Sequence, residues 1–236
     1  MPHTPEEFDL RINRLKADMC EQGRRVTAMA ELSVEALFDG DPDKAERVVR
    51  ADAVIDRVDV EAEKAAVRLL HDVAHQVAAL DDHQLRMVLT IVKVNNELER
   101  IADLSVDIAQ LHRPVEDTGC SIPPTFRVMA NSVLGVLQTT NRCFERLDTR
   151  LAREVLASDY TVDEFERILL RENQTALAAG TVSVDAALTL HTVAGSLERI
   201  NDHCSNIAEQ VIYVESGSIV RHQGGQWIDP KNPEAG

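Results

Sequence analysis

Apolar residues recur at spacings of three and four along most of the chain, as Ile12, Leu15 and Met19 illustrate near its start. This spacing places them on one face of an α-helix. No segment shows the sustained period-two alternation that is typical of a half-buried strand. The pattern therefore predicts an all-α protein, whose turn signals separate six helices over Pro5–Phe38, Pro42–Gln76, Asp82–His112, Pro124–Arg146, Thr149–Ala178 and Val184–Ser216.

Polar residues and glycines mark the predicted helix boundaries. Asp81, Asp148 and Ser183 stand where a side-chain oxygen caps a helix N-terminus. Gly217 stands where a left-handed residue ends a helix. Three prolines and a glycine in the segment 113–124 indicate a linker. We therefore expect a first three-helix unit over residues 1–113, a linker over 114–123, a second three-helix unit over 124–217 and a flexible tail over 218–236.

The two halves of the chain repeat each other. The segment Leu98–Ala109 aligns with Leu197–Ala208 at an offset of 99, and seven of the twelve positions are identical. A second alignment, at an offset of 107, pairs Asp41, Ala45, Val48, Asp52 and Asp56 with Asp148, Ala152, Val155, Asp159 and Asp163. Duplication of one helix–helix–helix unit explains both alignments. We therefore predict two tandem three-helix bundles, built from six antiparallel helices and related by an internal repeat.

Acidic side chains form a column on the last helix of each unit. The members of a column are four residues apart and lie away from the apolar face of the helix. The columns comprise Glu99, Asp103 and Asp107 in the first half, and Glu198, Asp202 and Asn206 in the second. The preceding helices add one acid pair each at the same spacing, which are Asp52 with Asp56 and Asp159 with Asp163.

These columns predict a metal site. Like charges four residues apart destabilise a helix by roughly a few tenths of a kcal/mol per pair, so a bound cation would relieve a column of carboxylates. Carboxylate and amide oxygens are hard ligands that suit magnesium, calcium and manganese, and also iron where several carboxylates bridge. The alternative is that the columns are solvated faces of an acidic chain. Arg100 and Arg199 directly follow the two glutamates, and because adjacent helical positions do not face each other, we expect them to pair elsewhere.

Charge and missing motifs argue against several classes of function. The 236 residues carry a net charge of −15, from 25 Lys and Arg against 40 Asp and Glu, which disfavours a nucleic-acid partner. No apolar run is long enough to span a bilayer and residues 1–15 lack a secretory apolar core, so we expect a cytoplasmic protein. The sequence has no Glu-x-x-His pair, phosphate-binding glycine loop or nucleophile elbow, and it therefore does not support catalysis.

Three features together carry a resemblance to a known family. They are the paired segments Leu98–Asp103 and Leu197–Asp202, the acid pairs that precede them, and the closing segment Val211–Gly217. The chain resembles PhoU, a family of phosphate-uptake regulators. The resemblance implies two similar three-helix bundles that bind metal clusters, iron or zinc among them, at the surface. By position the ligands would be Glu99, Asp103, Asp107, Glu198, Asp202 and Asn206, with Asp52, Asp56, Asp159 and Asp163 at the family's other acidic positions.

The resemblance also implies a role and partners. It suggests a non-enzymatic protein that represses phosphate uptake and phosphate-starvation signalling. Such a protein would link the ATPase subunit of the phosphate ABC transporter to a membrane-bound sensor histidine kinase. It would work in the cytoplasm at the inner face of the membrane, often as a homodimer. Two other interpretations of the acidic columns remain open, an enzyme with a carboxylate-bridged metal centre and a helical scaffold that binds no metal.

Overall fold

The computed structural model describes residues 5–75, 80–119 and 121–220. Within these ranges the chain forms seven α-helices and no strand. The helices are α1 (Pro5–Asp39), α2 (Pro42–His75), α3 (Asp82–Gln110), α4 (His112–Thr118), α5 (Pro124–Arg146), α6 (Thr149–Ala178) and α7 (Val184–Ser216). The prediction of an all-α protein is confirmed.

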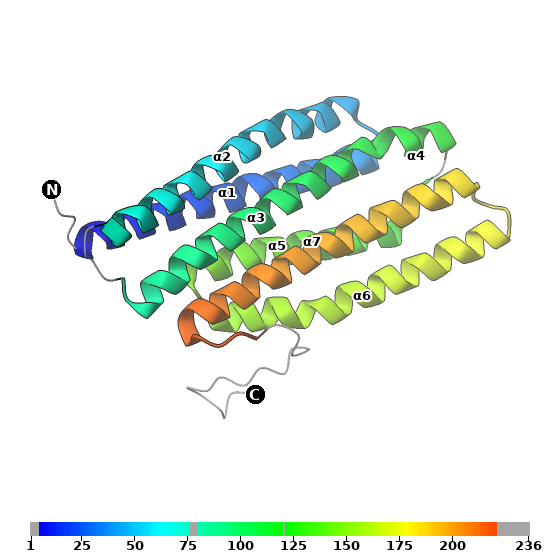
Figure 1. Cartoon of the computed structure of the whole chain (residues 1–236). Helices are drawn as coiled ribbons and strands as arrows, with labels where there is room; N and C mark the ends of the chain where they lie inside the picture. Colours follow the sequence, from blue (N-terminus) through cyan, green and yellow to red (C-terminus); the bar gives the residue numbers. More distant parts are fainter. Residues whose placement is uncertain (1–4, 76–79, 120, 221–236) are drawn as a thin grey trace.

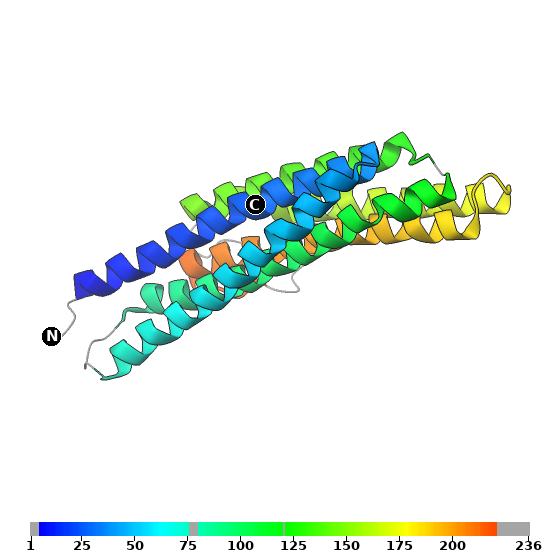
Figure 2. The ribbon, with the colours of Figure 1, turned by 90° about the horizontal axis from the view of Figure 1, so that it is seen from above.

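The six long helices form two layers. In one layer α2, α3, α7 and α6 lie side by side in that order (Figure 1). Figure 2 shows α1 and α5 together on the other side of these four helices. The first repeat is α1 to α3 and the second is α5 to α7, and the two meet where α3 contacts α7 and α1 contacts α5. Two helix pairs therefore join the predicted bundles.

A short helix occupies part of the segment that was expected to be a linker. Pro114 lies in the first turn of α4, where its missing N–H removes no intrahelical hydrogen bond. Gly119 ends α4 in a left-handed conformation with a φ of 61°. One of the three prolines that suggested a linker therefore lies in the first turn of a helix, and the glycine ends that helix. The preceding helix α3 correspondingly ends at Gln110 and not at His112.

The predicted caps of the later helices are present. Asp148 accepts hydrogen bonds from the backbone N–H groups of two residues in the first turn of α6. The Ser183 hydroxyl accepts one from the backbone N–H of Ala186 at the start of α7. Gly217 ends α7 with a φ of 75°. Because these caps satisfy otherwise unpaired backbone groups, they account for the start of α6 and for both ends of α7, which lie at the predicted residues. The bounds of α5 also match the prediction, although no side-chain hydrogen bond caps its N-terminus.

One hydrophobic core runs through both repeats. Leu98 and Ile101 of α3 and Leu197 and Ile207 of α7 are all at most 2% exposed and belong to this core. Burial of apolar area on both sides of the α3–α7 contact therefore holds the repeats together. The core also contains Val220, which we had expected to lie in a flexible tail. The other parts of the predicted units, residues 1–4, 76–79, 120 and 221–236, lie outside the described ranges.

A polar contact fixes the crossing of α1 and α5. The Asn141 side-chain amide donates to the Gly23 carbonyl at 3.0 Å and to the Thr27 hydroxyl at 2.6 Å. A Cβ atom at position 23 would lie 2.4 Å from the Asn141 Oδ1, so any larger residue there would push the Asn141 side chain away. This contact sets the position of one repeat against the other.

Candidate functional site

Five carboxylates lie close together on the α2–α3 pair, and we call them the first cluster. They are Asp52, Asp56 and Asp59 of α2 and Glu99 and Asp103 of α3. Burial, then the carboxylates of Asp56 and Asp103, raise the pKa of Asp52. Burial and the surrounding acids likewise raise the pKa of Glu99. The acids of α2 and α3 therefore lie close enough to raise one another's pKa.

Two oxygens of the first cluster are buried without a hydrogen-bond donor among the described residues. They are Oδ1 of Asp52 and Oε2 of Glu99. Burying a carboxylate oxygen without a donor costs free energy, because the oxygen loses its hydrogen bonds to water and no protein donor replaces them. Such oxygens are suited to accept a cation.

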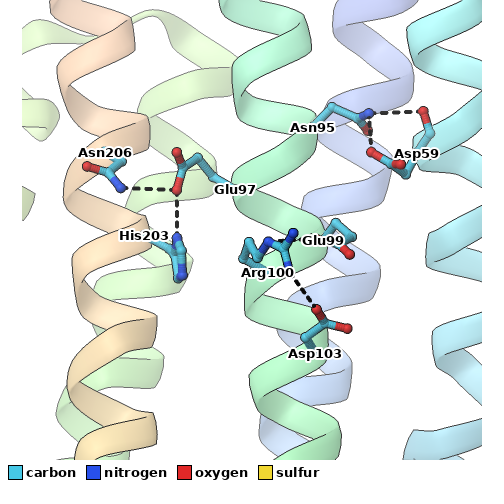
Figure 3. Close-up of polar contacts among 8 residues, drawn as sticks. All are labelled: Asp59, Asn95, Glu97, Glu99, Arg100, Asp103, His203 and Asn206. Atoms are coloured by element: carbon cyan, nitrogen blue, oxygen red, sulfur yellow. Dashed lines mark hydrogen bonds and ion pairs between the residues drawn. The ribbon is translucent and has the colours of Figure 1, made fainter.

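Arg100 provides the first cluster with a positive charge. Its Nη1 donates to Oδ2 of Asp103 at 3.2 Å, and its Nε lies 3.3 Å from Oε2 of Glu99 (Figure 3). The latter contact is an ion pair whose angle is unsuited to a hydrogen bond, so the Glu99 oxygen still lacks a donor. The prediction that Arg100 pairs elsewhere is wrong, because its long side chain folds back toward both acids.

Asp59 was not among the predicted ligands. Its carboxylate accepts a hydrogen bond from the Asn95 side chain of α3 at 2.7 Å (Figure 3). Its counterpart at an offset of 107 is Glu166 of α6. The acids at 52, 56 and 59 follow one helix face with spacings of four and three, and those at 159, 163 and 166 do the same. Extending the predicted pairs by one turn would have identified both residues.

The second cluster occupies the equivalent positions of α6 and α7. It comprises Asp159, Asp163, Glu166, Glu198 and Asp202. Asn201 donates to Oδ1 of Asp159 at 2.8 Å, and the Ser205 hydroxyl donates to the same oxygen at 3.4 Å. Burial, then the acids at 163 and 202, raise the pKa of Asp159. Each repeat therefore gathers five acids at matching sites.

A proton reduces the negative charge of the second cluster. Burial, then the carboxylate of Asp202, raise the pKa of Glu198 to about 7, and a hydrogen bond between the two side chains favours the protonated Glu198. Burial also raises the pKa of Asp202. Arg199 turns away, as predicted, and donates to the Gly195 carbonyl and the Ser196 hydroxyl, both at 3.3 Å. The two carboxyl groups can therefore share one proton, which reduces their mutual repulsion.

The last member of each predicted column lies apart from the cluster. The Asn206 amide donates to Oε2 of Glu97 at 3.1 Å, and His203 Nδ1 lies 2.6 Å from the same oxygen, so both residues join α7 to α3 (Figure 3). The predicted ligand Asn206 is therefore bonded to Glu97 of the first repeat and is not a member of the second cluster. Asp107 is exposed one turn beyond Asp103. The reason is geometric, since each step of four residues rotates a helical position by about 40° and two steps carry it around the helix.

The donor atoms fit a hard cation, although they are not assembled around one. In the part of the chain that the structure describes, no three His, Cys, Asp or Glu side chains are grouped to hold a metal ion. For a cation to bind, the carboxylates of a cluster would have to turn toward one another. In the first cluster the Arg100 guanidinium would also have to move away, and in the second cluster Glu198 would have to lose its proton. The orphaned oxygens and the mutual repulsion of the acids favour that exchange.

A duplicated three-helix unit with an acidic cluster in each copy defines the class of protein. A family model described as the PhoU domain matches residues 19–111 and again residues 126–211, and the two matches contain both clusters. The chain belongs to the PhoU family. It is 31% identical over 216 residues to the Thermotoga maritima protein named phosphate-specific transport system accessory protein PhoU homolog 1, which covers 91% of each chain.

Solved structures share the fold. The crystal structure of PhoU from Pseudomonas aeruginosa matches with a TM-score of 0.83 and 29% identity, over 89% of this chain and all of that one. The phosphate transport system regulatory protein PhoU from Streptococcus pneumoniae matches with a TM-score of 0.82, over 90% of this chain and 99% of its own, and its 23% identity supports the fold alone. Within the described ranges, no helix combines the length and apolar content of a membrane span.

Proposed function

We propose that this protein is a metal-binding regulatory adaptor that restrains phosphate uptake and phosphate-starvation signalling. One observation carries the proposal: the family match covers both repeats, and each matched repeat contains an acidic cluster. The related chains are named as accessory or regulatory proteins of phosphate transport, which favours a non-enzymatic role. The partners would be the transporter's ATPase subunit and a sensor histidine kinase, contacted in the cytoplasm at the inner membrane face by a homodimer.

In this proposal the two clusters hold the cations. The ligands would come from Asp52, Asp56, Asp59, Glu99 and Asp103 in the first repeat, and from Asp159, Asp163, Glu166, Glu198 and Asp202 in the second. Iron, zinc, manganese and magnesium are the candidate ions, since oxygen-rich sites accept each of them. A bound cation would cancel the repulsion between facing helices and could bridge an acidic face to a partner.

Metal analysis of the purified protein tests the chemical part. We expect binding of manganese or iron to weaken roughly tenfold or more when Glu99, Asp103, Glu198 and Asp202 are all changed to Ala, because each cluster loses its α3 or α7 ligands. The matched control changes Asp107 and Asn206 to Ala, which should leave binding unchanged because these residues lie outside the clusters. Equal binding by all three proteins would refute the metal sites.

A gene deletion tests the regulatory part separately. Loss of the protein should raise alkaline phosphatase activity and phosphate uptake in phosphate-rich medium. The wild-type gene should restore repression. The quadruple Ala variant at the four cluster positions should restore it less well if metal is needed. Unchanged phosphatase and uptake after deletion would contradict the regulatory role whatever the metal result.

A further inference from the structure

The α1–α2 pair carries a groove that belongs to neither acidic cluster. Two hollows, of about 770 Å³ and about 370 Å³, share Arg25 and together extend from Leu15 to Glu35 along α1. A helical segment of this length spans about 30 Å. The groove lies on a different side of α2 from Asp59, whose partner Asn95 belongs to α3.

The floor of the groove is apolar. Leu15, Met19 and Met29 of α1 form part of it, and α2 contributes Val54 and Val58. Leu15, Met19 and Met29 are buried, whereas Val54 is 43% exposed, so the floor opens to solvent at Val54. An elongated apolar strip of this kind is typical of a surface that meets another molecule.

The two rims of the groove carry opposite charges. The α1 rim has the acids Asp18, Glu21, Glu31 and Glu35 beside Arg25, whereas the α2 rim has Arg47, Arg50, Arg57 and Arg68 beside Glu61. Within the described ranges, Arg47, Arg57 and Arg68 make no ion pair, although the whole chain contains 40 acids. Three arginines that form no ion pair, on one rim of a protein this acidic, favour an acidic ligand along that rim.

The geometry points to this groove as the docking site of an amphipathic helix from a partner protein. The apolar stripe of that helix would cover the floor, as in other helix-in-groove interfaces. Its acidic edge would lie along the α2 arginines, and its other edge, basic or neutral, along the α1 acids. Among the described residues of the α1 rim, Glu21 pairs with Arg25 and Glu35 with Lys44, whereas Asp18 and Glu31 form no ion pair. A helix with acids on both edges would be repelled by those two carboxylates, so the two rims select the charge pattern and the direction of the partner. This docking does not depend on metal binding.

Two synthetic helical peptides of about 21 residues, a length of about 30 Å, test the charge pattern. Both have the same leucine stripe and the same numbers of Glu and Lys. In the sorted peptide Glu occupies one edge and Lys the other, whereas in the mixed peptide both edges carry Glu and Lys alternately. We expect fluorescence anisotropy to show at least tenfold tighter binding of the sorted peptide at low salt, with the difference shrinking as salt screens the rims. Equal affinities would overturn the proposal.

Two matched variants of α2 test the location. Val54→Asp places a charge on the floor, whereas Val49→Asp changes a residue that is 42% exposed and does not line the groove. We expect Val54→Asp to weaken binding of the sorted peptide at least tenfold and Val49→Asp to leave that binding unchanged. Both variants should retain the helical circular dichroism of the wild type. Changing Arg47, Arg57 and Arg68 to Gln should remove the preference for the sorted peptide.

Other occupants give different results. Binding to phosphatidylglycerol vesicles that Val54→Asp abolishes, without any preference between the peptides, would assign the groove to a lipid surface and overturn the helix. A change from dimer to monomer with Val54→Asp, again without a peptide preference, would assign it to a second copy and also overturn the proposal. The helix-docking proposal is supported if Val54→Asp loses binding of the sorted peptide and Val49→Asp does not, with vesicle binding and oligomeric state unchanged in both variants.

Discussion

The two acidic clusters occupy equivalent positions but reduce their charge in different ways. In the first repeat, Arg100 lies against Glu99 and Asp103 and supplies a permanent positive charge. In the second, Arg199 turns to its own helix, and burial with Asp202 raises the pKa of Glu198 to about 7. An arginine keeps its charge at every accessible pH, whereas a proton exchanges with solvent. Duplication thus preserved the acids while the means of neutralising them diverged.

The difference has a consequence for ligands. A cation that enters the first cluster must compete with a guanidinium that is about half exposed and therefore weakly held. A cation that enters the second cluster competes with a proton, so its binding depends on pH. The two sites are therefore expected to differ in affinity and in pH dependence, although their carboxylates match.

The largest expected effect concerns the asparagines beneath the clusters. Asn201→Ala should lower the free energy of unfolding by about 2–3 kcal/mol, because it leaves the partly buried Asp159 carboxylate with only the longer hydrogen bond from Ser205 and leaves a space at a fully buried position. Asn95→Ala should cost less, about 1–2 kcal/mol, since the positive charge of Arg100 still partly opposes the burial and the neighbouring acids that raise the pKa of Asp59. Urea unfolding in the presence of chelator measures both. A larger loss for Asn95→Ala would reverse the comparison.

The second prediction concerns the removal of Arg100 from the first cluster. In a background that carries Asp202→Asn, so that the first cluster dominates binding, Arg100→Gln should tighten manganese binding roughly tenfold, because a competing positive charge is gone. The matched control is Arg199→Gln in the same background, which should have no effect since Arg199 contacts no cluster acid among the described residues. Calorimetric titration distinguishes the two. Equal effects would mean that Arg100 does not occupy the cation position.

A smaller effect is expected from pH. The pKa of Glu198 is raised from 4.5 to about 7 in the folded protein by burial and by the acids at 163, 166 and 202. The folded state therefore binds this proton more tightly than the unfolded state. Its contribution to stability is complete below pH ~4.5 and is lost as the pH rises through ~7.

Melting temperatures measured in chelator from pH 5 to 8 test this sign. The metal-free protein should become less stable over that interval, and Glu198→Gln should flatten the dependence because it cannot release a proton. Glu99→Gln is the matched change in the first repeat, where the raised pKa of Glu99 is opposed by Arg100, and it should flatten the dependence less. Stability that increases from pH 5 to 8 would contradict the assignment.

Much of this protein follows from its sequence by local rules. A helix periodicity of 3.6 residues and the caps at Asp148, Ser183 and Gly217 determined where the later helices begin and end. The internal repeat determined that the acids occur twice in register, and Asp59 with Glu166 could have been added by following the same helix face. These inferences succeed because backbone hydrogen bonds and helix phase depend on residues a few positions apart.

Only the tertiary structure decided which side chains contact those acids. Arg100 approaches Glu99, Arg199 does not approach Glu198, and Asn206 bonds to Glu97 of the other repeat. The α4 helix, the core position of Val220 and the charged groove between α1 and α2 were likewise not foreseen. Side-chain direction, burial and the resulting pKa values depend on which helices pack together, and that packing joins residues far apart in the sequence, such as Asn206 and Glu97.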